Sequence, residues 1–141
     1  MEVKERVCAK AKELFFRYGF KSITMDEIAT QLGMSKKTLY QYYADKDQLV
    51  EVIMEEEMKC MQDENCRYQQ DSDNAIHEFF LDMDGMEQVM STLNPLVIFD
   101  LEKFHPKTFE RFKQYKNTFW LQLIKANIER GRKEDLYRLD F

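Results

Sequence analysis

Apolar residues recur at intervals of three and four along most of this chain, which is the spacing that places them on one face of an α-helix. The pattern covers residues 2–18, 46–71, 72–90, 95–104 and 107–131. Polar residues that suit helix starts precede several of these stretches: Ser72 or Asp73 before the third, and Asn94-Pro95 at the start of the fourth. No segment alternates apolar and polar residues with a period of two over a useful length. The sequence therefore predicts an all-α fold.

Two shorter helices are predicted just before residue 46. Thr24-x-x-Glu27 is a capping box, in which the Thr24 hydroxyl accepts the Glu27 N–H and the Glu27 carboxylate reaches back to the Thr24 N–H. Gly33 is suited to end that helix in the left-handed conformation. Ser35 is a good N-cap for the next helix, which carries Leu39 on its apolar side. Two short helices joined by a glycine turn indicate a helix-turn-helix.

The polar residues of the second short helix indicate what kind of molecule this helix binds. Lysines near a helix N-terminus oppose the helix dipole, so they weaken the helix unless they face an anion such as a phosphate. Hydroxyl, ammonium and amide side chains are also the groups that contact DNA phosphates and base edges. The competing interpretation is a charged face in contact with solvent only. The residues concerned are Ser35, Lys36, Lys37, Thr38, Tyr40, Gln41 and Tyr42.

Residues 18–49 resemble the DNA-binding signature of TetR-family transcriptional regulators, through the run YGF-x-x-I-T-M-D-E-I-A-x-x-L-G-M-S-K-K-T-L-Y-x-Y-Y-x-x-K-D-x-L. Tyr43 stands where the family usually has Phe, and Lys37 where many members have Gly or Pro. The resemblance implies that Thr24 and Lys46 contact the DNA backbone, that Tyr40 and Tyr42 hold phosphates, and that the first turn of the second helix faces the groove. The predicted DNA-binding residues are Thr24, Ser35, Lys36, Lys37, Thr38, Tyr40, Gln41, Tyr42 and Lys46.

The resemblance also implies a division of labour. We expect a DNA-binding domain over residues 1–46 and a helical, antiparallel effector-binding and dimerisation domain over residues 47–141. The expected function is that of a ligand-responsive regulator, most simply a repressor that a small apolar or aromatic effector releases from its operator. The partners would be a palindromic double-stranded DNA operator and a second copy of the chain, because a two-fold dimer reads two half-sites.

The long helix predicted from Lys46 begins with a second capping box, Asp45-x-x-Gln48, and meets no breaker until about Asp71. A helix of this length that starts on the DNA-binding segment can act as a rigid lever, so that its displacement by a ligand changes the separation of two DNA-reading heads. Cys60-x5-Cys66 lies within it. Neither its spacing nor nearby histidines match a zinc site, so we predict no metal.

The C-terminal helices are rich in aromatic residues and methionine. For any single residue a place in a helix-bundle core is the favoured interpretation, whereas the functional alternative is a pocket for the effector. His77 and His105 are isolated, and His105 is most simply a helix-boundary residue before Pro106. Gly85 is a candidate bend. The candidate effector-binding residues are Phe80, Met83, Phe99, Phe112, Phe119 and Trp120.

The segment KEDLYRLDF after Gly131 resembles the link into the last two helices that family members use for dimerisation, and the sequence stops at Phe141. Two interpretations stay open at this point. The second domain is a C-terminally truncated or incomplete version of a longer one, or dimerisation is made differently.

Charge, hydropathy and cysteine content further restrict the possible functional classes of the protein. The net charge of -5 is unevenly distributed: residues 1–50 hold nine Lys/Arg and seven Asp/Glu, a balance of +2, and the other 91 hold twelve and nineteen, a balance of -7. The basic surface is thus N-terminal, as attraction to phosphate requires. No apolar run is long enough to span a membrane, and three cysteines without a scaffold spacing suit a reducing cytoplasm.

No catalytic motif, phosphate-binding glycine loop or cofactor signature occurs, so we expect no enzyme and no cofactor. The alternative to a DNA-binding regulator is a helical protein-interaction module that keeps the helix-turn-helix for packing only. Burial of the surface from Lys36 to Tyr42 would favour that alternative.

Overall fold

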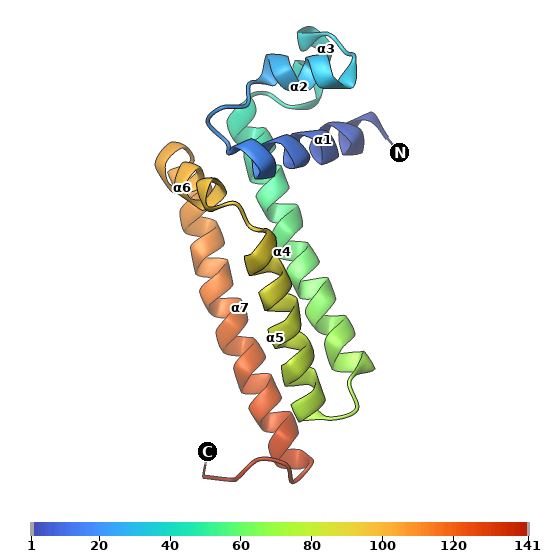
Figure 1. The fold of residues 1–141 in the computed structure, drawn as a ribbon, viewed down its shortest axis with the longest axis vertical. Coiled ribbons are helices and arrows are strands. Elements are labelled where there is room, and N and C mark those ends of the chain that lie inside the picture. Colours follow the sequence, from blue (N-terminus) through green and yellow to red (C-terminus); the bar gives the residue numbers. More distant parts are fainter. Residues whose placement is uncertain (1, 141) are drawn as a thin grey trace. The chain divides into compact units, whose positions relative to one another are not determined.

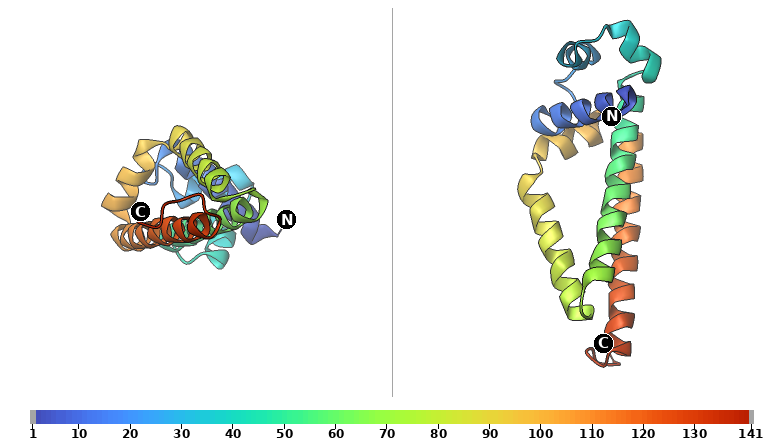
Figure 2. Two further views of the ribbon diagram at one scale, coloured as in Figure 1. Left: turned by 90° about the horizontal axis from the view of Figure 1, so that it is seen from below. Right: turned by 90° about the vertical axis from the view of Figure 1, so that its right-hand side faces the viewer.

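The computed structural model describes residues 2–140, and all of their regular structure is helical, as predicted (Figure 1). The helices are α1 (Val3–Tyr18), α2 (Met25–Leu32), α3 (Lys36–Tyr42), α4 (Lys46–Asp71), α5 (Ala75–Thr92), α6 (Pro95–Phe104) and α7 (Pro106–Lys133). The chain forms two compact units. Unit 1 comprises Met1–Glu57 and Leu93–Phe112, and unit 2 comprises Met58–Thr92 and Lys113–Phe141. The long helices α4 and α7 contribute to both units, and Figure 2 shows their uninterrupted course. The expected division into a DNA-binding domain (residues 1–46) and an effector-binding domain (residues 47–141) concerns function and does not coincide with these units, so it stays a prediction.

Most helix ends follow from their capping residues. The N-cap of α2 is Thr24, whose hydroxyl accepts the Glu27 N–H at 3.2 Å, and that of α6 is Asn94, followed by Pro95 as predicted. Among the described residues the reciprocal bond of the Thr24 capping box, from the Thr24 N–H to the Glu27 carboxylate, is not formed. Two details differ from the prediction at the other helix starts. In the second capping box the Gln48 side chain accepts the N–H of Ala44, at 2.6 Å, instead of that of Asp45.

The second difference is the start of α5, where Asn74 takes the place of Ser72 or Asp73. The Asn74 side chain accepts the His77 N–H at 2.9 Å. Ser72 is instead held by Arg130, whose Nη1 lies 2.7 Å from its hydroxyl. A tertiary contact therefore decides which of three adjacent capping residues begins the helix.

Unit 1 has a continuous apolar core. The apolar side of α1 meets α2, α3, the start of α4 and α6, and the rings of Phe15 and Phe20 lie 5.1 Å apart between their centroids. Tyr18, which the spacing placed on the same stripe, is instead 47% exposed because it stands at the end of the helix. Cys8 is buried at the edge of this core, as predicted for a small filler. The fully buried members include Val7, Ala11, Phe15, Phe20, Ile28, Leu39, Leu49, Val50, Ile53 and Leu101.

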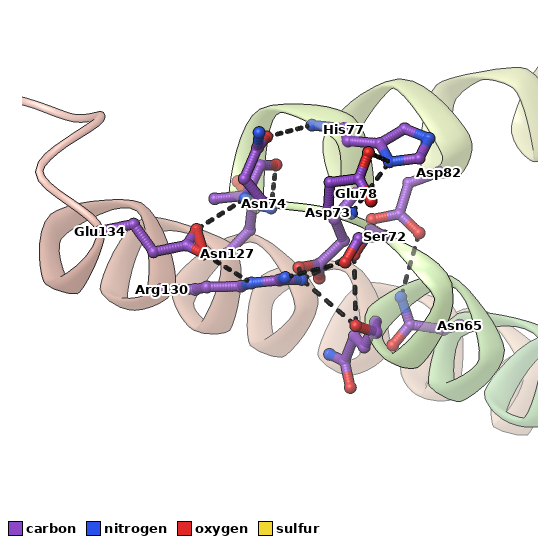
Figure 3. Close-up of polar contacts among 12 residues, drawn as sticks. Asn65, Ser72, Asp73, Asn74, His77, Glu78, Asp82, Asn127, Arg130 and Glu134 are labelled. Atoms are coloured by element: carbon purple, nitrogen blue, oxygen red, sulfur yellow. Dashed lines mark hydrogen bonds and ion pairs between the residues drawn. The ribbon is translucent and has the colours of Figure 1, made fainter.

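Unit 2 is built differently, because several of its buried side chains are polar and are joined by hydrogen bonds and an ion pair (Figure 3). Glu78 of α5 is 1% exposed and accepts a hydrogen bond from Arg130 of α7 at 2.8 Å. The Asn127 amide donates to the Ala75 carbonyl at 2.9 Å, and the Ala75 N–H donates to the Glu134 carboxylate at 2.7 Å. These bonds join the start of α5 to the end of α7.

The predicted apolar side of α5 exists, but it faces solvent in this chain. The buried side of the helix carries Glu78 and Asp82 instead. Gly85 does not interrupt α5; the Tyr68 ring of α4 lies so close that a Cβ at Gly85 would be 2.9 Å from the Tyr68 hydroxyl. The exposed apolar residues are Ile76, Phe79, Phe80, Met83, Met86, Val89 and Met90.

Candidate nucleic-acid interface

The turn between α2 and α3 is set by one glycine. Gly33 has φ 67°, in the left-handed region that other residues rarely adopt, and the following Met34 N–H donates to the Ala29 carbonyl at 3.0 Å. Ser35, two residues after Gly33, is the N-cap of α3, and its hydroxyl accepts the Thr38 N–H at 3.1 Å. The helix-turn-helix geometry predicted from these residues is therefore present.

Two buried side chains determine which side of α3 faces outward. Leu39 is fully buried, and Tyr43, directly after the helix, is 2% exposed. The Tyr43 hydroxyl donates to the Lys4 carbonyl at 3.2 Å, which ties the end of α3 to the start of α1. Burial raises the pKa of Tyr43 to about 12, so the hydroxyl stays protonated and keeps donating at neutral pH. Tyr in place of Phe is thus accommodated in the core, as expected, with one additional hydrogen bond.

The opposite side of α3 presents the predicted polar residues to solvent. Thr38 is half-buried, and its hydroxyl lies 2.8 Å from that of Ser35. The surface from Lys36 to Tyr42 is therefore not buried, as it would be if the helix-turn-helix served only for packing. The exposed members are Ser35, Lys36, Lys37, Tyr40, Gln41 and Tyr42.

The charges on this face are only lightly screened. The Lys36 ammonium lies 3.2 Å from Asp26 of α2 and 5.9 Å from the centroid of the Tyr40 ring. Both partners of the ion pair are more than half exposed, so water and salt weaken it and its contribution is below about 1 kcal/mol. Lys37 forms no ion pair with the residues that the structure describes. A phosphate could displace Asp26 at small cost.

The two flanking residues differ from each other. Thr24 is exposed, and because its oxygen accepts the Glu27 N–H, its hydroxyl proton is available to a phosphate. Lys46 is half-buried: its ammonium lies 5.7 Å from the centroid of the Phe15 ring and 3.5 Å from the Lys21 carbonyl oxygen. Burial lowers the pKa of Lys46. A backbone contact by Lys46 stays a prediction and requires this side chain to turn outward.

Helix α6 is bonded to the end of α1 and to the α1–α2 turn, a feature that the sequence did not predict. The Asn94 amide donates to the Arg17 carbonyl at 2.9 Å, and the Asp100 carboxylate accepts the Lys21 N–H at 3.1 Å. Gly19 permits this approach, since a Cβ there would lie 2.5 Å from the Asp100 oxygen. We call Asn94, Asp100 and His105 the α6 clamp.

His105 completes the α6 clamp. It is the C-cap of α6, as its position before Pro106 indicated, and its Nδ1 lies 2.7 Å from the Asp47 carboxylate in the first turn of α4. The imidazole is 8% exposed, and burial lowers its pKa although Asp47 acts in the opposite direction. At neutral pH the imidazole is therefore uncharged, so its contact with the Asp47 carboxylate is not an ion pair. No sequence pattern signals such a long-range pair.

The six candidate effector residues do not form one group. Phe99 and Phe112 belong to unit 1, where Phe112 packs against the apolar core and Phe99 is 57% exposed. The others belong to unit 2, where Phe80 and Met83 are exposed and the rings of Phe119 and Trp120 lie 5.8 Å apart. Two shallow surface depressions lie along α1 and α2, and none of the six residues lines them. Their role in effector binding stays a prediction.

Within the described residues there is no group of three potential metal ligands, and Cys60 and Cys66 are exposed and unpaired. Among the same residues, no helix combines the length and apolar character that crossing a membrane requires.

Comparison with known proteins agrees with the helix-turn-helix geometry. Residues 8–53 match the family described as bacterial regulatory proteins, tetR family. The chain is 38% identical over 104 residues to the uncharacterized HTH-type transcriptional regulator YvaF of Bacillus subtilis (strain 168). That match covers 72% of this chain and 53% of YvaF, so the chain spans about half the length of this relative.

Solved structures share the fold. The fatty acid degradation regulator FadR from Bacillus halodurans superimposes with a TM-score of 0.76 at 13% identity, covering 100% of this chain and 75% of that one. The repressor FadR of Thermus thermophilus, solved in complex with lauroyl-CoA, gives 0.54 at 22% identity, covering 98% and 72%. The matched proteins are transcriptional regulators, in agreement with the prediction that the chain is not an enzyme. Residues 8–53 thus match the DNA-binding region of the TetR family, and the chain shares its fold with solved transcriptional regulators.

Proposed function

We propose that this chain is a transcriptional regulator that binds double-stranded DNA through the outward side of α3. The main support for the proposal is that α3 has one buried side and one exposed polar side. Leu39 and Tyr43 are buried, whereas Lys36, Lys37 and Tyr40 are exposed. This surface offers ammonium, hydroxyl and amide groups in the combination that reads phosphates and base edges. The positive balance of residues 1–50 supports the same assignment.

The chemistry of each contact differs. Lys36, Lys37, Tyr40 and Tyr42 suit phosphate contacts, which set affinity and are sensitive to salt. Gln41, near the end of the helix, and Lys37 in its first turn can also donate to base edges in the major groove. Phosphate contacts would position the helix, and one or two side chains would supply sequence preference.

We further propose that DNA binding responds to a small effector and that the chain acts as a repressor in a two-fold dimer. The match to the TetR family and the exposed apolar side chains of α5 support effector binding. The α6 clamp supports coupling, because α6 holds the α1–α2 turn through Asp100 and the start of α4 through His105. A shift of α6 would therefore change the support of the DNA-reading helices.

In-vitro selection from random double-stranded DNA tests the proposal. The full chain is expected to enrich a palindrome whose half-sites are separated by about 10 base pairs or a multiple, the spacing of recognition helices in a two-fold dimer. Enrichment of a single half-site without symmetry would contradict the dimer. Absence of any enriched sequence, with the protein folded by circular dichroism, would contradict specific DNA binding.

A further inference from the structure

The buried side of α5 carries one carboxylate with a partner and one without. Glu78 is neutralised by Arg130, whose guanidinium lies 2.8 Å from the carboxylate. Asp82, one turn later and 7% exposed, forms no ion pair with the described residues. Its Oδ1 accepts a hydrogen bond from the Asn65 amide of α4 at 3.1 Å, whereas its Oδ2 is buried and has no hydrogen-bond partner (Figure 3).

A buried anion of this kind is costly unless something compensates for its charge. Burial is the main cause that raises the pKa of Asp82 to about 6; the neighbouring charge of Glu78 also raises the pKa, and the Asn65 hydrogen bond lowers it. At a pH above 7 the carboxyl group is still mostly ionised. The chain therefore keeps an uncompensated negative charge inside unit 2, one helical turn after Glu78, whose own charge is paired with Arg130.

The side chains that border Asp82 are apolar and accessible. Phe79 and Met86 stand three residues before and four residues after Asp82, so both adjoin it where the buried side of α5 meets the exposed apolar side. Phe79 and Met86 are 48% and 41% exposed. On α4, the Tyr68 ring lies against Gly85 and adds an aromatic surface that favours a nearby cation. A buried anion with an apolar border fits a molecule that has one cationic and one apolar end.

We propose that Asp82 binds the protonated amine of a small amphiphilic effector whose apolar part packs on Phe79 and Met86. The term effector rests on the proposed function, whereas the binding itself concerns unit 2 alone. An ammonium group suits the site better than a metal ion, because its N–H groups can be satisfied by one carboxylate and a few neighbouring acceptors. Among the described residues no third acidic, His or Cys ligand is present for a metal.

Thermal unfolding of the full chain at pH 7.5 tests the binding, with n-hexylamine as the probe. A ligand that binds only the folded chain raises Tm in a saturable manner. We expect n-hexylamine to raise Tm by several degrees, n-hexanol to have a much smaller effect, and KCl at equal ionic strength to have none. Equal shifts with n-hexanol or KCl, or no shift with n-hexylamine, would overturn the proposal.

Three variants locate the effect. Asp82→Asn should weaken n-hexylamine binding at least about tenfold, while Asp84→Asn, which removes an exposed carboxylate from the same helix, should leave it unchanged. Met86→Lys places an ammonium on the chain four residues after Asp82; it should raise Tm without the probe and block the probe. An unchanged response in Asp82→Asn, or in Met86→Lys if the first variant does not fold, would overturn the proposal.

Operator binding separates this inference from the proposed function. With DNA obtained by selection, n-hexylamine should change the affinity of the unmodified chain and not that of Asp82→Asn. If the chain binds no DNA, the proposed function fails and the unfolding experiment still decides whether Asp82 binds the amine. If the amine binds at Asp82 but leaves DNA affinity unchanged, its role as an effector is refuted.

Discussion

Unit 1 and unit 2 differ in how much apolar surface they bury. The apolar core cluster of the chain lies entirely in unit 1, where α1, α2, α3 and α6 contribute rings and branched aliphatic residues. Unit 2 buries Ser72, Glu78, Asp82 and Asn127, while the apolar side of α5 is in contact with solvent. Apolar burial is the main source of stability in proteins of this size, whereas buried ionic groups are weak contributors that become costly when one partner is lost.

The two units are therefore expected to differ in rigidity and in their response to pH and to bound molecules. Unit 1 has what a rigid support for α3 needs, because its packing fixes which side of the helix faces outward. Unit 2 depends on a few polar pairs and leaves apolar surface uncovered, so it is the unit whose stability should respond most to pH and to bound molecules. Four changes test this contrast, followed by one measurement of DNA binding.

The largest effect is expected in the core of unit 1. Phe15→Ala removes a fully buried ring that packs on Phe20 and should lower the free energy of unfolding by about 4 kcal/mol. Tyr18→Ala in the same helix removes a half-exposed ring and should cost less than about 1 kcal/mol. Urea unfolding of the two variants measures the difference. Similar losses in both would contradict a core centred on Phe15.

The next effect concerns the polar interior of unit 2. Arg130→Ala leaves Glu78 buried without its cation and should cost about 3 kcal/mol. The control is Arg138→Ala, whose ion pair with Asp140 is exposed and should contribute at most about 0.5 kcal/mol. Adding Glu78→Gln to Arg130→Ala should restore part of the loss. No restoration would mean that the unpaired charge is not the cause.

A smaller effect is expected from the α6 clamp. Asp100→Ala leaves the Lys21 N–H without its acceptor and should cost about 1 to 2 kcal/mol, whereas Glu102→Ala on the exposed side of α6 should be nearly neutral. If the clamp supports the DNA-reading helices, Asp100→Ala should also reduce DNA affinity more than its effect on stability explains. Equal DNA affinity of the two folded variants would remove α6 from the coupling.

The smallest effect is a pH dependence in unit 2. The folded-state pKa of Asp82 is about 6, above the ordinary value of 3.8, so the folded chain binds the proton more tightly than the unfolded chain. This contribution is present at low pH and is lost as the pH rises through 6. Lowering the pH from 7 to 5 should therefore stabilise the chain by about 1 kcal/mol relative to Asp82→Asn. The measurement is urea unfolding of both proteins at each pH.

Helix positions could be predicted from the sequence where the stop and start signals are local. Asp45 and Asn94-Pro95 define the starts of α4 and α6, and both helices have the predicted bounds. The start of α5 could not be predicted, because three capping residues in a row compete and a contact with Arg130 fixes one of them.

In the candidate interface, too, local features were predictable from the sequence and long-range contacts were not. The outward side of α3 follows from local spacing around Leu39 and Tyr43, so it was predicted with its residues. The α6 clamp joins residues that are far apart in sequence, such as Lys21 and Asp100, and no periodicity reveals such a pair. The exposure of the apolar side of α5 was likewise not predictable, since spacing indicates that a helix has an apolar side but not what covers it.

The most direct test of the central claim is the salt dependence of DNA affinity. Lys36→Ala combined with Lys37→Ala is compared with Lys59→Ala combined with Lys116→Ala, a pair of exposed lysines in unit 2. If α3 faces phosphates, the first pair should weaken binding and reduce the slope of log affinity against log salt by about 1 to 2 per bound chain, and the second should change neither. An unchanged affinity and slope in the first pair would contradict DNA binding through α3.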